Sequence, residues 1–286
     1  MDSLSLKIVL LAVLQGLTEF LPISSSGHLA VMQTLFDIRE DNLLITVVLH
    51  AGSLLAILVC YRSDLLALRR REHWRDLGLL ACGTAPLVML GLPLKRLADR
   101  YETNLWVTAA GFMVTFVLLV LVYRRREAKP TPAAVTWVDA LWIGGLQCVA
   151  VAPGISRSGS TIAIAGRRGL TPDAAARFSF LLAIPAIGGA IILKGKDLLT
   201  GPRPALAVGP LAVGLAVSFA VSCGALTLLL RILRRGRLAG FGYYCLGAAL
   251  VTLALAAHRQ FSAGHQQVGR DAPRPGYEQP IVEGQP

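Results

Sequence analysis

Charged side chains are scarce in this chain. Asp, Glu, Lys and Arg make up 16% of its 286 residues, whereas they make up about a quarter of a typical soluble domain. Hydrophobic residues reach 54%, and the mean hydropathy is +0.60. The scarcity of charge excludes an ordinary soluble domain and indicates an integral membrane protein, which the lengths of its apolar runs predict to be all-α.

Acidic residues are the scarcer of the two charge signs. The sequence has 17 Asp and Glu against 28 Lys and Arg, which gives a net charge of +11. A basic balance of this size can indicate a nucleic-acid partner. Here, however, the arginines stand in short loops between apolar segments, as they do in the cytoplasmic loops of membrane proteins. We therefore expect no nucleic-acid partner.

Cysteines with metal-ligand spacing are absent too. The five cysteines stand singly in apolar segments, which is typical of free, buried thiols. The first apolar segment also lacks the layout of a cleaved signal peptide, because Lys7 runs straight into apolar sequence without a small-residue cleavage site. We expect this segment to stay in the mature chain.

Long apolar runs are what the sequence does have. A helix needs about 20 apolar residues to cross a bilayer, and several stretches come close to or reach that length. They are residues 43–61, 77–94, 105–123, 175–193, 207–230 and 239–257. Two further apolar stretches, 4–36 and 136–168, are each interrupted in the middle, at Pro22–Gly27 and at Pro153–Gly159.

The two interrupted stretches resemble each other. A shift of 132 positions without a gap places identical residues opposite one another. The identical pairs are Leu14 and Leu146, Gln15 and Gln147, Ile23 and Ile155, Ser24 and Ser156, Ser26 and Ser158, and Gly27 and Gly159. Such a match is hard to obtain by chance and indicates an internal repeat.

The interruptions constrain the architecture, because lipid cannot satisfy the backbone groups that a broken helix leaves free. A re-entrant helical hairpin, which enters and leaves the membrane on one side, can enclose each break. The sequence thus predicts one polytopic membrane domain over residues 1–257, with repeat 1 at about 1–125 and repeat 2 at about 133–257. Each half is a hairpin plus three transmembrane helices. Three is odd, so the second copy is inverted, which favours a functional site near the midplane where the breaks meet.

An alternative to the two hairpins is an architecture of eight ordinary membrane spans that are kinked at proline. After Ala257 the sequence becomes polar and rich in Pro, Gly and Gln, and we expect residues 258–286 to form a disordered tail.

The distribution of arginine predicts the orientation. Loops 62–76, 124–135 and 231–238 are rich in Arg, and the alternate loops are poorer in basic residues. Because basic loops stay in the cytoplasm, the first hairpin should enter from the outer face and the second from the cytoplasm. The site should then open to the outer face.

The breaks carry the residues that could take part in catalysis or ligand binding. Glu19 is the one acid between Leu4 and Phe36, and Arg157 lies mid-segment between Pro153 and Gly159. Ionisable groups at such depth are usually functional. Arg157 offers a planar fork of donors suited to phosphate, and a helix that starts in a Ser- and Gly-rich break offers free backbone N–H groups. Glu19 and His28 could supply a base, an acid or a ligand for a hard cation.

Purely structural roles stay open for several of these residues. Serines in membrane helices often bond to the carbonyl one turn back, and Ser24 and Ser26 could do the same. An Arg in a membrane segment can also be a snorkelling anchor. His50, in the stretch 43–61, could line the site, although a packed and hydrogen-bonded role is the more frequent one.

The two motifs resemble the signature motifs of the undecaprenyl-pyrophosphate phosphatases, the bacitracin-resistance proteins of bacterial membranes. They run from Gln15 through Glu19 to His28 and from Pro153 through Arg157 to Thr161, and the similarity covers about residues 4–257. The resemblance implies that Glu19, Ser25, His28 and Arg157 are catalytic. It also implies substrate-binding roles for the residues Gln15, Ser24, Ser26, Ser156, Ser158 and Thr161.

The same resemblance implies a divalent cation, Mg²⁺ or Ca²⁺, with Glu19 as its ligand. Gln15 stands where the family has Glu or Gln, and an amide there cannot act as a second base. The implied function is hydrolysis of undecaprenyl diphosphate in the bacterial inner membrane, which recycles the lipid carrier for cell-wall synthesis and confers bacitracin resistance. Membrane lipids surround such a protein, and a homodimer stays open as its assembly.

Two other functions compete with hydrolysis. An inverted repeat alone favours a transporter or a flippase for polyprenyl phosphate. A purely structural membrane protein would leave the polar breaks unexplained.

Overall fold

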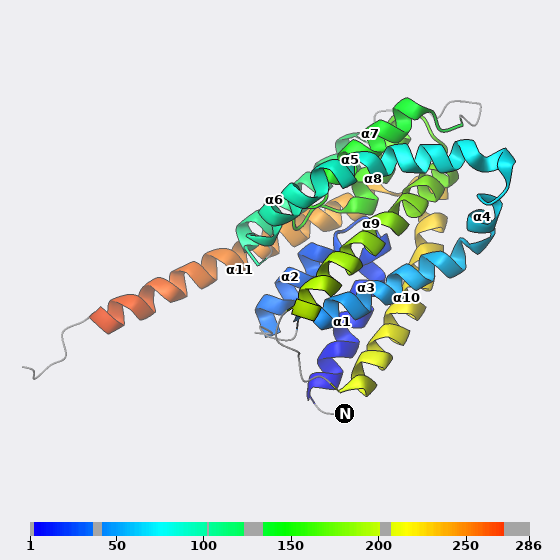
Figure 1. Ribbon diagram of the computed structural model, residues 1–286. Helices are drawn as coiled ribbons and strands as arrows, with labels where there is room; N and C mark the ends of the chain where they lie inside the picture. The colour runs from blue at the N-terminus through cyan, green and yellow to red at the C-terminus, as the bar shows by residue number, and fades with distance from the viewer. Residues whose placement is uncertain (1–2, 37–41, 102, 123–133, 201–206, 272–286) are drawn as a thin grey trace, which may run out of the picture.

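The computed structural model describes residues 3–36, 42–101, 103–122, 134–200 and 207–271, and every regular element in these ranges is helical. The order along the chain is visible in Figure 1. The elements are α1 (Ser3–Phe20), α2 (Ser25–Phe36), α3 (Asn42–Cys60), α4 (Arg62–Ala67), η1 (Arg71–His73), α5 (Trp74–Asp99), α6 (Leu105–Val117), η2 (Leu118–Val122), α7 (Trp137–Val149), α8 (Arg157–Arg167), α9 (Pro172–Thr200), α10 (Val208–Arg234) and α11 (Ala239–Asp271).

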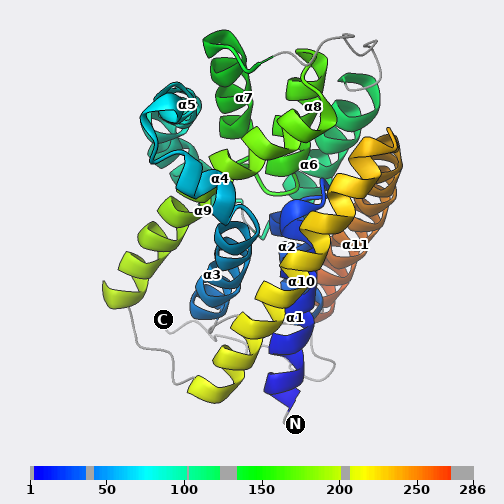
Figure 2. The same cartoon turned by 90° about the vertical axis from the view of Figure 1, so that its right-hand side faces the viewer.

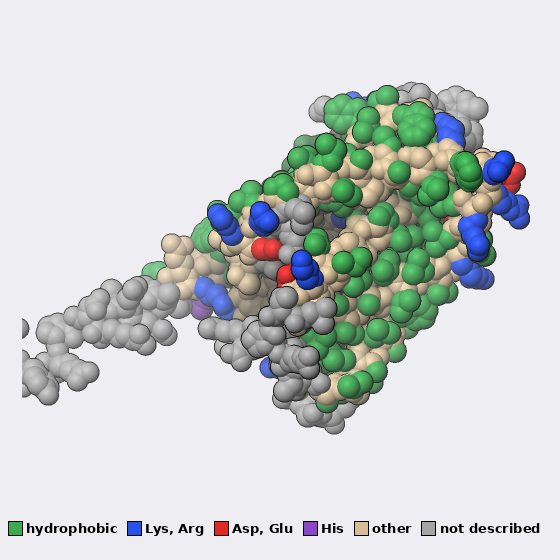
Figure 3. Space-filling view, in the orientation of Figure 1, with side chains coloured by type: hydrophobic (Ala, Val, Ile, Leu, Met, Phe, Trp, Pro, Cys, Tyr) green, Lys and Arg blue, Asp and Glu red, His purple; other side chains and the backbone are tan. Residues whose placement is uncertain are grey.

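All six predicted apolar spans coincide with helices. Within the described residues, four helices are long and apolar enough to cross a membrane, at Leu43–Cys60, Pro172–Leu198, Val208–Arg234 and Ala239–Phe261. The stretch 77–94 lies inside α5, and 105–123 corresponds to α6 with the π-helical turn η2. Figure 3 shows a broad hydrophobic face, with Lys and Arg at both of its ends, including the right-hand end beside α4. These features are those of a helical membrane protein.

Both predicted breaks separate two helices. Residues 21–24 lie between α1 and α2, and residues 150–156 lie between α7 and α8. Proline explains part of this, because it cannot donate the hydrogen bond that would continue a helix. Glycine explains another part, since Gly154 has a φ of +86°, which L side chains rarely adopt.

The helices of the two halves are interleaved. Helix α1 packs mainly against α10, α7 against α5, and α6 against α11. Figures 1 and 2 both show α1 beside α10 and α6 beside α11. In the repeat, α1 corresponds to α7 and α10 to α5, so the α1–α10 pair is the counterpart of the α7–α5 pair. The first helix of each interrupted stretch therefore packs on a helix of the other half of the chain.

Buried hydroxyls join two of these helices, α3 and α10. Ser218 of α10 donates to the carbonyl oxygen of Leu49 at 2.7 Å, and Ser222 donates to Ser53 Oγ of α3 at 3.1 Å. The three serines are fully buried. Such bonds satisfy polar groups that lipid could not, and they tie α3 to α10.

Two expectations need correction. Helix α11 continues to Asp271, so residues 258–271 are helical where we expected disorder, while 272–286 lie outside the described residues. All five thiols are free, as expected, but only Cys148 and Cys245 are buried, and Cys60 is exposed. The helix continues because its polar residues after 257 include no proline before residue 273.

Candidate active site between the two breaks

The two breaks are in direct contact, as the repeat predicted. Ser158 at the start of α8 donates a hydrogen bond to the carbonyl oxygen of Leu21 in the first break, at 3.2 Å. A Cβ added to Gly27 would lie 2.8 Å from the Cα of Gly154, which is closer than real Cβ atoms come. Glycine at both positions lets the two backbones meet.

The repeated residues form the same helix cap twice. Ser24 Oγ accepts a hydrogen bond from Gly27 N at 3.2 Å, and Ser156 Oγ accepts one from Gly159 N at 3.1 Å. Capping serines satisfy N–H groups that the first turn of a helix leaves free. The copies differ in the backbone, because Ser24 has a φ of +69° whereas Ser156 has a φ of −77°. A left-handed serine is uncommon and marks the first break as a place of local strain.

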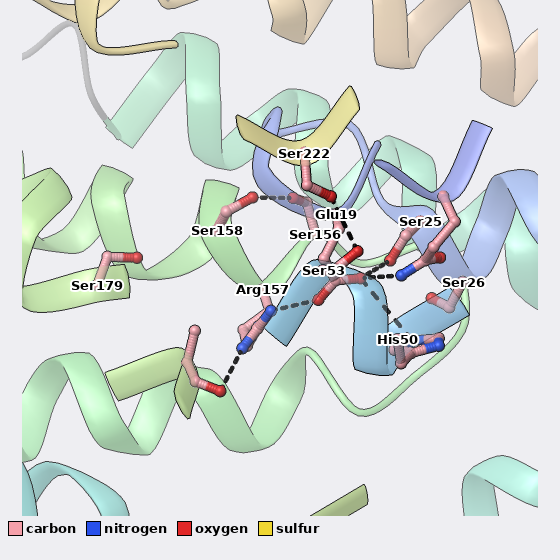
Figure 4. A network of polar contacts seen from close by, with 12 residues as sticks. Glu19, Ser25, Ser26, His50, Ser53, Ser156, Arg157, Ser158, Ser179 and Ser222 are labelled. Carbon is pink, nitrogen blue, oxygen red and sulfur yellow. Dashed lines mark hydrogen bonds and ion pairs between the residues drawn. The ribbon is translucent and has the colours of Figure 1, made fainter. Parts of the chain in front are cut away.

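Glu19 and Arg157 form an ion pair across the breaks (Figure 4). Arg157 donates through Nη2 to Glu19 Oε1 and through Nη1 to the carbonyl oxygen of Ala183 at 3.2 Å. The side chains of Arg157 and Glu19 are 17% and 6% exposed. Each charge offsets the other in a site where an unpaired charge would be costly.

The second oxygen of the same carboxylate faces the first motif. Ser25 Oγ donates to Glu19 Oε2 at 2.7 Å, and Gln15 Nε2 donates to it at 2.9 Å. A hydroxyl bonded to a carboxylate is the arrangement of a nucleophile and its base. The structure therefore brings together Glu19, Ser25, Arg157 and Gln15.

The two histidines of the region lie differently from our expectation. His28 has both ring nitrogens bonded, Nδ1 to the carbonyl oxygen of Ser24 at 2.7 Å and Nε2 to the Tyr244 hydroxyl at 2.8 Å. None of its described contacts is to Glu19 or Arg157. His50 instead has its Nε2 at 3.8 Å from Glu19 Oε2, and its Nδ1 bonds to the Thr46 carbonyl oxygen at 2.8 Å.

The other predicted hydroxyls mostly support the backbone. Thr161 bonds to the carbonyl oxygen of Arg157 at 2.8 Å and to Ser179, and Ser156 bonds to Ser158 at 3.2 Å. Ser26 is exposed and contacts Ser24 at 3.3 Å.

Two further residues near the breaks were given no role by the sequence analysis. Thr115 of α6 accepts from Ser156 N at 2.9 Å and donates to the Gly154 carbonyl oxygen at 3.0 Å, which fixes the second break. Gln147 is buried with no partner for either amide atom. Its identity with Gln15 in the repeat was a signal for Gln147, but nothing in the sequence marked Thr115.

A cation could be held only in part by the protein. Among the described residues, no group of three His, Cys, Asp or Glu side chains could hold a metal ion. The buried Gln15 Oε1 has no hydrogen-bond partner, and it sits on the amide that bonds Glu19. One carboxylate and one free amide oxygen suit a hard cation that takes its remaining ligands from water or phosphate.

The fold and the site define a class of helical membrane protein with a polar centre enclosed between two helix breaks. The chain belongs to the family described as Bacitracin resistance protein BacA, whose pattern matches residues 8–251.

Curated relatives agree with this assignment. The chain is 39% identical over 251 residues to the undecaprenyl-diphosphatase of Rhodopirellula baltica, which covers 87% of this chain and 97% of the relative. It is 41% identical over 266 residues to the undecaprenyl-diphosphatase of Desulfosudis oleivorans, in an alignment that covers 86% of this chain and 96% of the relative. It is 35% identical over 259 residues to the undecaprenyl-diphosphatase of Carboxydothermus hydrogenoformans, in an alignment that covers 90% of this chain and 99% of the relative.

Proposed function

We propose that this chain hydrolyses undecaprenyl diphosphate to undecaprenyl phosphate and inorganic phosphate. It thereby recycles the lipid carrier of cell-wall synthesis and confers resistance to bacitracin. The relatives' names support the reaction. The observation that carries the proposal is the Glu19 carboxylate, which bonds Arg157 through one oxygen and the Ser25 hydroxyl through the other.

The geometry supports a division of roles. Ser25 attacks the terminal phosphorus while Glu19 takes its proton, and the bond from that phosphorus to the bridging oxygen breaks. Undecaprenyl phosphate leaves with the bridging oxygen, and water then cleaves the phosphoserine to restore Ser25. Arg157 binds the phosphate oxygens and stabilises their charge in the transition state. Trapping a phosphorylated Ser25 during turnover would separate this route from direct attack by a water held at Glu19.

Substrate has to displace part of the present bonding. Arg157 uses one nitrogen on Glu19 and another on the Ala183 carbonyl oxygen, so an incoming phosphate competes for a guanidinium that is already bonded. Ser24, Ser26, Ser156, Ser158 and Thr161 act with it, Ser26 by direct contact because it is exposed and the others by holding the breaks in shape. His28, one turn after Ser25 on α2, exchanges a proton with the departing phosphate after its Nε2 gives up the bond to the Tyr244 hydroxyl.

A divalent cation belongs to this proposal. Glu19 and the unpartnered Gln15 Oε1 would hold it together with diphosphate oxygens. When bound, the cation neutralises phosphate charge and polarises the phosphorus centre.

We also propose the inverted arrangement and its orientation. Each interrupted helix pair is a re-entrant hairpin, and the halves are related by inversion. The interleaved helix pairs α1–α10 and α7–α5 support this. The Arg168–Asp139 ion pair of 2.6 Å supports it too, because it joins the start of α7 to the end of α8. The enzyme lies in the bacterial inner membrane, with its basic loops in the cytoplasm and its site open to the outer face.

The decisive test is phosphate release by the purified protein in detergent. A polyprenyl diphosphate should yield inorganic phosphate there, although no second compartment exists. A flippase, which the interleaved halves also suit, would release none under the same conditions. Absence of phosphate release with every divalent cation tried would overturn the phosphatase proposal.

A further inference from the structure

His50 of α3 stands apart from the residues that the motifs identify, yet it reaches the carboxylate at the centre of the site. Its Nε2 lies 3.8 Å from Glu19 Oε2, and its side chain is 23% exposed (Figure 4). That separation is too long for a hydrogen bond. It matches two ligand atoms of one metal ion, which lie about 3 to 4 Å apart when each bond is about 2.0 to 2.2 Å.

The other ring nitrogen fixes the state of this histidine. Nδ1 lies 2.8 Å from the Thr46 carbonyl oxygen, and a carbonyl can only accept, so Nδ1 carries the proton. In the neutral ring, Nε2 therefore presents its lone pair towards Glu19. Histidines that bind metals typically donate their second nitrogen to a backbone carbonyl or a carboxylate in this way. His28 lacks that freedom because both its nitrogens are bonded.

Gln15 supplies the independent observation. It is fully buried, and its Oε1 has no partner. A half-turn of the amide would place this oxygen beside Glu19 Oε2 in place of Nε2, which now donates there at 2.9 Å. In that rotated form, two acceptor oxygens and the nitrogen lone pair of His50 would face one another, and they would repel unless a cation lay between them.

Resting on the proposed function, we infer that His50 is a ligand of the catalytic cation, alongside Glu19 and Gln15, and that it sets the cation preference of this enzyme. Imidazole suits Zn²⁺, Fe²⁺ and Ni²⁺, whereas carboxylate, carbonyl and water oxygens suit Mg²⁺, Ca²⁺ and Mn²⁺. The site thus selects a transition-metal ion over Mg²⁺.

Charge decides when the cation binds. Arg157 already neutralises Glu19, so a divalent cation alone would leave excess positive charge in a buried site. A diphosphate brings several negative charges and restores the balance. Cation binding should consequently be much tighter with a diphosphate in the site.

The test is pulsed electron paramagnetic resonance of Mn²⁺ bound to the purified full chain with methylenediphosphonate, which resists hydrolysis. The spin-echo signal should show modulation by ¹⁴N from one imidazole. His50→Gln should abolish the modulation and weaken Mn²⁺ binding about tenfold or more, with a smaller effect on Mg²⁺. His28→Ala is the matched control and should retain the modulation.

Each other result contradicts the inference. Wild-type protein without nitrogen modulation, or modulation lost in His28→Ala and kept in His50→Gln, shows that His50 is no ligand. Labelling the wild-type histidines with ¹⁵N changes the signal without any substitution, so the presence of a histidine ligand does not depend on how the variants fold. The comparison of His50→Gln with His28→Ala then identifies which histidine it is. Phosphate release without nitrogen modulation would refute the inference alone, whereas nitrogen modulation without phosphate release would refute the proposed reaction alone.

Discussion

At the scale of single residues, Arg157 joins three elements at once. It sits at the start of α8, bonds Glu19 of α1 and bonds the Ala183 carbonyl oxygen of α9. The two contacts use two nitrogens of one planar group, which a single ammonium cannot reproduce. The sequence alone predicted that Arg157 would meet Glu19 or Ser25, and the ion pair confirms this.

Arg157→Lys should therefore be nearly inactive although the charge is kept. We expect phosphate release to fall by about a hundredfold, the usual cost of removing one donor from a transition state. Arg235→Lys, at an exposed position just after α10, is the control and should release phosphate like the wild type. Normal turnover by Arg157→Lys would mean that Arg157 only anchors its helix.

At the scale of elements, the second break depends on a backbone that fits only glycine. Gly154 combines a φ of +86° with a position where an added Cβ would lie 2.1 Å from the Thr108 carbonyl oxygen of α6. Backbone cannot move aside as a flexible side chain can. The backbone of the second break thus packs directly against the backbone of α6.

Gly154→Ala should destabilise the protein by more than 2 kcal/mol, since the left-handed conformation alone costs an alanine about 1 to 2 kcal/mol and the clash adds to it. Gly145→Ala is the matched control in α7, where nothing lies within 4 Å of the added Cβ. It should be neutral or slightly stabilising, because alanine favours helix over glycine. Thermal unfolding in detergent measures both, and equal midpoints for the two variants would contradict this account of the break.

The elements also show where sequence reasoning ends. The repeat predicted both breaks, because identical Ser and Gly residues form identical caps at residues 24–27 and 156–159. Thr115 could not be found in that way, since it reaches the site from a helix distant in sequence and carries no motif. His50 was named from the sequence only as a residue that could line the site, because no motif assigns it a role. Composition also misplaced the end of α11, because local helix formation continues through polar residues that contain no proline.

At the scale of the whole molecule, ion pairs join two of the basic segments to α9. Arg177 of α9 bonds Asp64 of α4 at 2.5 Å, and Arg234 of α10 bonds Asp173 at the start of α9 at 2.8 Å. Two of the arginine-rich segments, 62–76 and 231–238, are thus each tied to the same helix, while most of the third, 124–135, lies outside the described residues. Which acid each arginine selects depends on helix packing, and the sequence could not supply that.

The orientation can be tested by labelling of cysteines introduced at the two ends. Ser26 is exposed beside the site, whereas Arg237 is exposed in the turn after α10, at the basic end. Membrane-impermeant maleimide applied to intact spheroplasts should label Ser26→Cys and should not label Arg237→Cys, because we propose that the site opens outward while basic loops stay in the cytoplasm. Cys60 is also exposed, so both substitutions belong in a Cys60→Ser background. Labelling of Arg237→Cys alone would reverse the orientation and would place phosphate release on the cytoplasmic side.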